Sequence, residues 1–144
     1  MTVATVGDSA TTHMTVSTDE IENYAALVGD DNPLHVDDGY AAETMFEGRI
    51  AHGMLPAGLV SAALADLPGD VVYVSQDLEF RAPVRPGDTV AATVEVVEDL
   101  GEGQLRVRTT ATVGDTTVLS GEAVVLSLAH EPADGTCEAE AGAD

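Results

Sequence analysis

The sequence predicts an α+β fold in which an antiparallel β-sheet is wrapped around one central buried α-helix. Residues 53–67 are almost all apolar or small, and a helix that is hydrophobic on nearly every side is typical of a protein core. From residue 71 to residue 128 the chain instead alternates polar and apolar residues with the period of β-strands. Such a sheet has only one strongly apolar helix to cover it, so we expect it to curl around that helix.

The chain is 144 residues long, which fits a single domain large enough to fold alone. Residues 1–10 are small and polar, and residues 130–144 consist largely of Glu, Ala, Asp and Gly. Segments this poor in apolar residues bury too little surface to fold, so we expect a flexible N-terminus and a disordered acidic tail. The folded domain is therefore expected at 11–129.

The domain is expected to begin with a strand and a helix. Residues 11–16 have the pattern of a short strand. Ser17 then offers an N-cap with Glu20 at the capping-box position, and apolar residues follow at helical spacing. Gly29 ends this helix, as a glycine just beyond the last helical turn commonly does.

An irregular segment and the apolar helix come next. Residues 30–50 are interrupted by Pro33 and Gly48, and we expect a helical turn or two between Leu34 and Glu43. The apolar helix extends over residues 53–67, where a Pro-Gly pair stops it.

Four strands are expected in the remaining part of the domain, at residues 71–80, 89–98, 104–113 and 116–128. The alternation is clearest from Gln104 to Val113. Glycine and aspartate separate the last three segments, which favours tight turns between antiparallel neighbours. The edge strands of such a sheet would need a partner subunit.

The charge balance is strongly acidic. The chain has 26 Asp and Glu against five arginines and no lysine, a net charge of -21. This charge would repel nucleic acid and anionic membranes, and it would destabilise a compact state through self-repulsion. Molar salt screens that repulsion, so we interpret the composition as adaptation to high salt, as in halophiles, and expect unfolding on desalting. An acidic DNA mimic is the alternative.

The cysteine content and the N-terminal residues indicate where the protein is located and whether cysteines could bind zinc. Cys137 is the only cysteine, so no intramolecular disulfide and no zinc-binding thiolate cluster can form. Residues 1–10 have neither the cationic nor the apolar region of a signal peptide, and no apolar run approaches a membrane span. We expect a soluble cytoplasmic protein that needs no metal.

A carboxylate and an imidazole flank a proline in the segment Gly29-Asp30-Asp31-Asn32-Pro33-Leu34-His35. Pro33 disfavours helical geometry at Asn32, so the chain between Asp30 and His35 must turn. Such a turn can place both side chains on one side, where they could hold a water and transfer protons near neutral pH. Alternatively, Asp30 caps a turn and His35 is a packed loop histidine.

Gly53 follows His52 at the expected start of the apolar helix. The first amides of a helix lack partners within it, and the helix dipole there favours negative charge. A glycine lets a substrate carbonyl approach such an amide, which would stabilise charge on a thioester oxygen. The alternatives are that Gly53 merely precedes a helix and that His52 is structural.

Three blocks of sequence resemble the MaoC-like hot-dog family, which includes the (R)-specific enoyl-CoA hydratases. These blocks are the Asp30 to His35 turn with Tyr40-Ala41, the segment from Phe46 through Ala51-His52-Gly53 to Ser61, and the segment from Phe80 to Asp88. The resemblance implies a hot-dog fold, usually as a homodimer whose sheets join edge to edge. It also implies reversible hydration of trans-2-enoyl-CoA to (R)-3-hydroxyacyl-CoA without a cofactor, coenzyme A being part of the substrate.

The resemblance further implies roles for individual residues. Asp30 and His35 hold the catalytic water, and the amide of Gly53 polarises the thioester carbonyl. Ser61 supports the substrate site, and Asn32 orients its loop. Because coupled groups share their protons, either Asp30 or His35 could be the base towards water.

The phosphates of coenzyme A need cations. Arg81 and Arg85 are the candidates, while Arg106 and Arg108 alternate with apolar residues and are expected on a solvent face; Arg49 could brace the site through a carboxylate such as Glu47. Two other classes of function stay open. One is another hot-dog acyl-CoA enzyme, either a dehydratase of branched or dicarboxylic acyl-CoA or a thioesterase, and the other is a non-catalytic acyl-binding protein.

Overall fold

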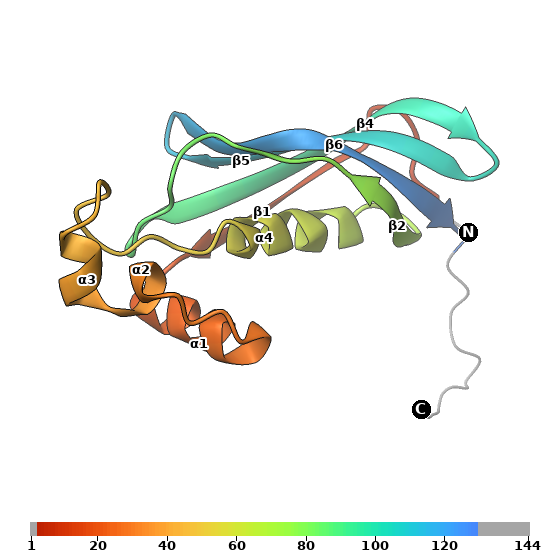
Figure 1. Cartoon of the computed structure of the whole chain (residues 1–144). Coiled ribbons are helices and arrows are strands. Elements are labelled where there is room, and N and C mark those ends of the chain that lie inside the picture. Colours follow the sequence, from red (N-terminus) through yellow and green to blue (C-terminus); the bar gives the residue numbers. More distant parts are fainter. Residues whose placement is uncertain (1–2, 130–144) are drawn as a thin grey trace.

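The computed structural model describes residues 3–129, so the expected acidic tail and Cys137 lie outside the described residues. In chain order its elements are β1 (Ser9–Thr15), α1 (Thr18–Val28), α2 (Pro33–Val36), α3 (Asp38–Ala42), α4 (Met54–Ala65), β2 (Asp70–Gln76), β3 (Glu79–Phe80), β4 (Thr89–Gly101), β5 (Gln104–Val113) and β6 (Thr116–Leu128). Helix α4 lies along one face of the sheet, and α2 and α3 lie beyond one end of it (Figure 1). No helix within residues 3–129 has both the length and the apolar character needed to cross a bilayer.

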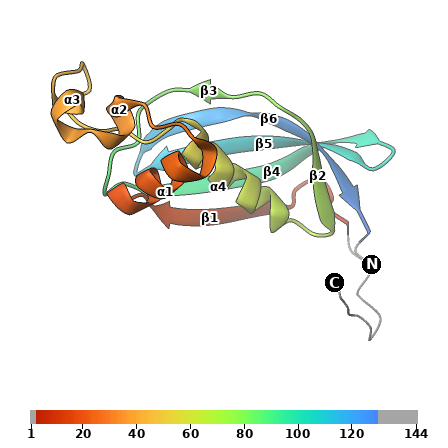
Figure 2. The same ribbon diagram turned by 60° about the horizontal axis from the view of Figure 1, so that its bottom comes forward.

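All strand pairs are antiparallel, in the order β1-β4-β5-β6-β2, and β3 also pairs with β6. Strand β2 therefore forms one edge of the sheet and β1 the other (Figure 2). The expected antiparallel sheet beside one apolar helix is confirmed.

The expected strand at residues 71–80 is wrong in one respect, because the structure divides it into β2 and β3. Between them the backbone turns inward at Asp77, whose N–H donates to the Glu122 carbonyl at 2.9 Å. A Cβ on Gly121 would lie 2.0 Å from the Asp77 carbonyl oxygen, so only glycine permits this close approach. The contact joins residues 44 positions apart, and local alternation carries no sign of it.

The core lies between the inner face of the sheet and α4. In β5 the side chains that the alternation predicted to be apolar and inward are buried, namely Leu105, Val107, Thr109 and Ala111. Thr109 keeps a hydrogen-bond partner despite its burial, because the Gln76 side-chain amide donates to its hydroxyl at 2.9 Å. Helix α4 contributes Leu59, Val60, Ala63 and Leu64 to this core.

Helix α4 is not buried on every side in the single chain, which corrects the expectation from its composition. Its exposed residues are Met54, Gly58, Ser61, Ala62 and Ala65. The sheet covers only the side of the helix that faces it. The edge strand β2 also exposes three consecutive apolar side chains, Val72, Tyr73 and Val74.

The N-terminal elements follow the sequence closely. Ser17 caps α1 in a capping box with Glu20, and the N–H of Gly29 donates to the Ala25 carbonyl at 2.8 Å at the helix end. Strand β1 begins at Ser9, two residues before the expected start. Ala4, within the segment expected to be flexible, is buried, and its N–H donates to the Ser127 hydroxyl at 2.9 Å.

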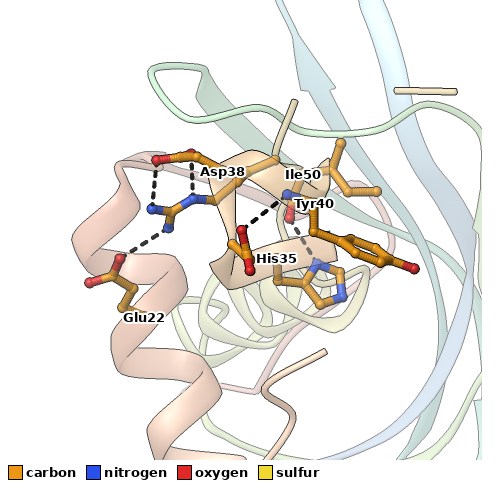
Figure 3. Close-up of polar contacts among 7 residues, drawn as sticks. Glu22, His35, Asp38, Tyr40 and Ile50 are labelled. Carbon is orange, nitrogen blue, oxygen red and sulfur yellow. Dashed lines mark hydrogen bonds and ion pairs between the residues drawn. The ribbon is translucent and has the colours of Figure 1, made fainter. Parts of the chain in front are cut away.

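Arg49 ties α1 to α3. Its guanidinium donates to both carboxylate oxygens of Asp38, at 2.8 and 3.3 Å, and to Glu22 at 3.0 Å (Figure 3). The side chain of Arg49 is only 10% exposed, whereas its partners Glu22 and Asp38 are largely open to water. The expected partner Glu47 makes no ion pair among residues 3–129; Glu22 and Asp38 take its place. The hydrogen bond and the charge of Arg49 hold the pKa of the Asp38 carboxyl below its ordinary value. In turn, the hydrogen bonds to Asp38 and Glu22 raise the pKa of Arg49.

Asp38→Asn should destabilise the protein near neutral pH and have little effect in acid. A carboxyl whose pKa is lowered by folding stabilises the fold above its ordinary pKa of about 3.9, and this stabilisation is lost as pH falls through the lowered value. Urea unfolding of both proteins at about pH 7 and at about pH 2.5 measures the difference. Asp115→Asn, at a turn without an ion pair among residues 3–129, is the control. If Asp38→Asn lowered the unfolding free energy equally at both pH values, the ion pair with Arg49 would not be the cause.

Candidate active site

The turn between Asp30 and His35 forms as the proline predicts. Asn32 has extended geometry and N-caps α2, its side-chain oxygen accepting from the Leu34 N–H at 3.2 Å, with Pro33 in the first turn. The N–H of Asn32 in turn donates to the Asp30 carboxylate at 3.4 Å. Asn32 is thus placed to shape the loop.

His35 lies on α2 and is partly buried. Its Nδ1 lies 2.8 Å from the carbonyl oxygen of Ile50 (Figure 3). A carbonyl oxygen only accepts hydrogen bonds, so Nδ1 carries the proton. In the neutral ring the Nε2 atom then has a free lone pair, which can accept a proton from a bound molecule.

The carboxylate of Asp30 lies close to two imidazoles. One side-chain oxygen of Asp30 and one ring nitrogen each of His35 and His52 all lie within 4.8 Å of one another. A water that makes hydrogen bonds of about 2.8 Å to both Asp30 and His35 fits this spacing. The structure therefore brings together the two groups that the sequence singled out.

His52 contacts both Asp30 and His35. Its Nε2 lies 2.8 Å from the backbone carbonyl oxygen of Asp30, and its ring stacks on that of His35 with centroids 4.0 Å apart. The Tyr24 ring also contacts the His52 ring, with centroids 4.8 Å apart and the two ring planes tilted at 56°. The remaining nitrogen, Nδ1, is buried without a hydrogen-bond partner among the described residues.

Asp30, His35 and His52 lie close enough together to suggest a metal site, but their hydrogen bonds argue against one. Nδ1 of His35 and Nε2 of His52 both donate to backbone carbonyls, and Nδ1 of His52 is buried. This leaves the Asp30 carboxylate and one nitrogen of His35, whereas protein zinc sites use three or four ligands. The donor set suits a water better than a metal ion.

Gly53 immediately precedes α4 and lines a cavity of about 360 Å³ together with His35 and His52. Its N–H has no hydrogen-bond partner within residues 3–129, as expected for an amide at a helix start. Asp30 does not line the cavity, but its exposed carboxylate lies next to His35, which does line it. A carbonyl bound in the cavity could therefore meet both the free amide and the water.

Phe80 adds a contact that sequence reasoning missed. A Cβ on Gly53 would lie 2.9 Å from Cε1 and 3.0 Å from Cδ1 of the Phe80 ring, so a side chain at position 53 would displace this exposed ring even without a substrate. Composition held a signal, since the chain has only two phenylalanines, and both of them, Phe46 and Phe80, line the cavity.

Ser61 and the two candidate arginines lie differently from the Asp30–His35 pair. Ser61 is on the exposed face of α4 and does not line the cavity. Arg81 lines the cavity, but its guanidinium donates to Ser120 at 2.8 Å and to Glu79 at 3.0 Å.

Arg85 differs from the other cations. Each of the other arginines pairs with a carboxylate: Arg49 with Glu22 and Asp38, Arg81 with Glu79, Arg106 with Glu98 and Glu122, and Arg108 with Glu95. Arg85 forms no ion pair with any residue from 3 to 129. Its Nη1 lies 3.7 Å from where a Cβ of Gly48 would be, beside the loop that contributes Phe46 and Ile50 to the cavity.

Comparison with known proteins places this site in a family. The domain described as "MaoC like domain" matches residues 2–119. A curated (R)-specific enoyl-CoA hydratase from Rhodospirillum rubrum is 49% identical over 123 residues, covering 83% of this chain and 85% of the relative. A 3-hydroxybutyryl-CoA dehydratase from Methylorubrum extorquens is 48% identical over 122 residues, covering 83% of this chain and 78% of the relative.

Solved structures agree with the sequence comparison. The unliganded R-hydratase from Pseudomonas aeruginosa superposes with a TM-score of 0.82 at 37% identity, covering 90% of this chain and 88% of the other. The (R)-hydratase from Aeromonas caviae superposes with a TM-score of 0.80 at 37% identity, covering 85% and 96%. The hot-dog fold implied by the sequence resemblance is confirmed, and the chain belongs to the MaoC-like family.

Proposed function

We propose that this protein is an (R)-specific enoyl-CoA hydratase, which adds water reversibly to a trans-2-enoyl-CoA to give an (R)-3-hydroxyacyl-CoA. One observation carries the proposal. The Asp30 carboxylate and the His35 imidazole, with Nε2 unprotonated, lie within 4.8 Å of each other, beside a cavity that Gly53 lines. Relatives that are nearly half identical bear the names of this reaction and of its reverse, the dehydration.

In the proposed cycle the oxygen of the bound water attacks C3 of the enoyl thioester while the Asp30–His35 pair removes one of its protons. The C2–C3 π electrons move onto the thioester, and the Gly53 N–H stabilises the negative charge on its oxygen. The pair then delivers the proton to C2 on the same face, which regenerates the resting state. The thioester itself acidifies C2, so we propose that neither a metal nor an organic cofactor takes part.

We also propose that two copies associate through the β2 edges of their sheets. Strand β2 exposes Val72, Tyr73 and Val74 at an edge whose backbone groups are open to pairing. The exposed side of α4 is also open to such a partner, and Ser61 lies on it. A homodimer would bring Ser61 towards a subunit boundary rather than leave it in solvent.

We further propose that the protein works in the cytoplasm, where it supplies (R)-3-hydroxyacyl-CoA to polyester synthesis or takes part in fatty acid metabolism. The Aeromonas caviae hydratase with the same fold is described as involved in PHA biosynthesis.

Replacing either member of the pair should abolish most of the activity while the fold stays intact. Asp30→Asn and His35→Ala should each lower kcat for crotonyl-CoA hydration by about 10²- to 10⁴-fold, because each removes a proton acceptor. Loss of enoyl absorbance measures hydration, and release of free thiol would reveal a thioesterase instead. The neighbouring Asp31→Asn and the surface His13→Gln are the controls. Full activity in both test variants would show that the site is wrongly assigned.

A side chain at position 53 should affect stability and activity for two separate reasons. Gly53→Ala should lower the unfolding free energy by about 1 kcal/mol at most, the low end for overpacking, because the new methyl group meets the Phe80 ring and that ring is exposed and can move. In a Phe80→Ala background the same change should cost little stability, yet activity should stay low if the methyl also obstructs the thioester oxygen. Denaturant unfolding and crotonyl-CoA kinetics of the four proteins test this. An equal stability cost in both backgrounds would exclude the Phe80 contact as the cause.

Arg85 should contribute to binding of the coenzyme A phosphates. Arg85→Ala should raise KM for crotonyl-CoA by about 5-fold without changing kcat, the range expected for an exposed charge pair. The effect should vanish with crotonyl-pantetheine, which lacks the phosphates. Arg108→Ala, whose guanidinium already pairs with Glu95, is the control. An equal rise in KM for both thioesters would place Arg85 away from the phosphates.

The protein should gain stability with salt, as proposed for a halophilic source. None of the carboxylates within residues 3–129 is buried, so salt can screen their mutual repulsion. The thermal unfolding midpoint should rise between about 0.1 M and about 2 M KCl, where the Debye length falls from about 10 Å to below 3 Å. A midpoint independent of salt would contradict the proposal.

A further inference from the structure

His52 has no part in the proposed proton transfers, yet it lies beneath both groups that carry them out. Of the three histidines described by the structure, it alone is buried, with 3% of its surface exposed. It lies one residue before the cavity-lining Gly53, so it belongs to the loop that leads into α4. His52 also lines the cavity, so its buried ring borders the site directly.

Two contacts of His52 reach the two members of the pair separately. The Nε2–H donates to the backbone carbonyl of Asp30 at 2.8 Å, and the ring stacks on His35 at 4.0 Å. The hydrogen bond restrains the main chain that carries the carboxylate, and the stacking restrains the plane of the imidazole. One side chain thus contacts both ends of the water-binding gap.

The turn alone restrains Asp30 only weakly. The carboxylate is exposed, and its one hydrogen bond within residues 3–129 is the long 3.4 Å contact from the Asn32 N–H. The bond from His52 is shorter and partly buried, so it is the stronger restraint on this part of the loop. The distance between Asp30 and His35 therefore depends on His52 more than on the local turn.

The unpartnered nitrogen of His52 supports a role for the other one. Among residues 3–129 no group hydrogen-bonds the buried Nδ1, which is unfavourable, and a wholly apolar ring in this position would avoid that cost. What histidine offers here and an apolar ring does not is the Nε2–H donor to Asp30.

We propose that His52 is a positioning residue for the hydratase reaction, fixing the Asp30 carbonyl through its Nε2–H and the His35 ring by stacking, and so setting the gap that holds the water. This inference rests on the proposed function. It predicts that the hydrogen-bond donor and the ring can be removed one at a time with different results.

Two substitutions separate the donor from the ring. His52→Phe keeps an aromatic ring but loses the donor, and should lower kcat for crotonyl-CoA by about 10²-fold, as small misplacements of reacting groups do, with KM changed less than about 2-fold. His52→Gln keeps an N–H at the reach of Nε2 and should restore kcat to within about 5-fold of the parent. His13→Gln controls for loss of an exposed histidine. If His52→Phe does not fold, His52→Leu is compared with His52→Gln instead, because neither has the ring and only glutamine keeps the donor.

A double-mutant cycle tests whether His52 acts through the pair. In a His35→Ala background, His52→Phe should lower the remaining rate by less than about 2-fold, because the geometry it sets is already lost. An additive loss would overturn the proposal. So would a full kcat in folded His52→Phe, or a change confined to KM.

The ¹⁵N resonances of the imidazoles provide a readout independent of activity. His35 should show protonated Nδ1 in the parent and in His52→Phe, which keeps a stacked ring, and altered or broadened signals in His52→Gln, which loses the ring. If the parent hydrates no enoyl-CoA but these signals behave as stated, the proposed function fails while the positioning by His52 stands. If the parent is active, His52→Phe leaves kcat unchanged and His52→Gln leaves the His35 signals unchanged, the positioning is overturned while the function stands.

Discussion

The hydrogen bond from Nδ1 of His35 to the Ile50 carbonyl determines what the site can do. With the proton held on Nδ1, the free lone pair is on Nε2, and the ring can take a proton from water; the opposite tautomer could not. The carbonyl is itself held in place, because the adjacent N–H of Ala51 donates to the Val84 carbonyl at 2.7 Å. The orientation of the His35 imidazole therefore depends, through Ile50 and Ala51, on Val84 in the segment that leads into β4.

Five consecutive residues connect the site to the rest of the fold, and each makes a different contact. Arg49 joins α1 to α3, Ile50 holds His35, Ala51 hydrogen-bonds Val84, His52 hydrogen-bonds the Asp30 carbonyl, and Gly53 precedes α4 beneath the Phe80 ring. The two halves of the site come from separate segments of the chain. This short loop fixes them relative to each other, so a change anywhere in it should alter the geometry between carboxylate, imidazole and amide.

Local patterns were sufficient to predict much of the fold and the elements of the site. The capping box at Ser17, the turn at Pro33 and the alternation of β5 each depend on neighbours in sequence, and each formed as predicted. The features that the sequence did not predict depend on contacts between distant segments. The strand break at Asp77 needs Gly121 across the sheet, and the partners of Arg49 are Glu22 and Asp38 rather than the nearby Glu47. The open side of α4 likewise depends on what the sheet covers, which composition cannot reveal.

The acidic surface affects substrate binding in two opposing ways. A protein of charge -21 repels an anionic coenzyme A thioester at long range, and salt removes this repulsion beyond one Debye length. Salt would also weaken a contact between Arg85 and a phosphate, but it would weaken the contact less than the long-range repulsion. Two charges in contact are closer together than the Debye length at moderate salt. Among residues 3–129 every other arginine is neutralised by a carboxylate, so an unpaired Arg85 is the one local attraction available once repulsion is screened. With Arg85 on a phosphate as proposed above, high salt should favour association with the substrate for the same reason that it should favour the folded state.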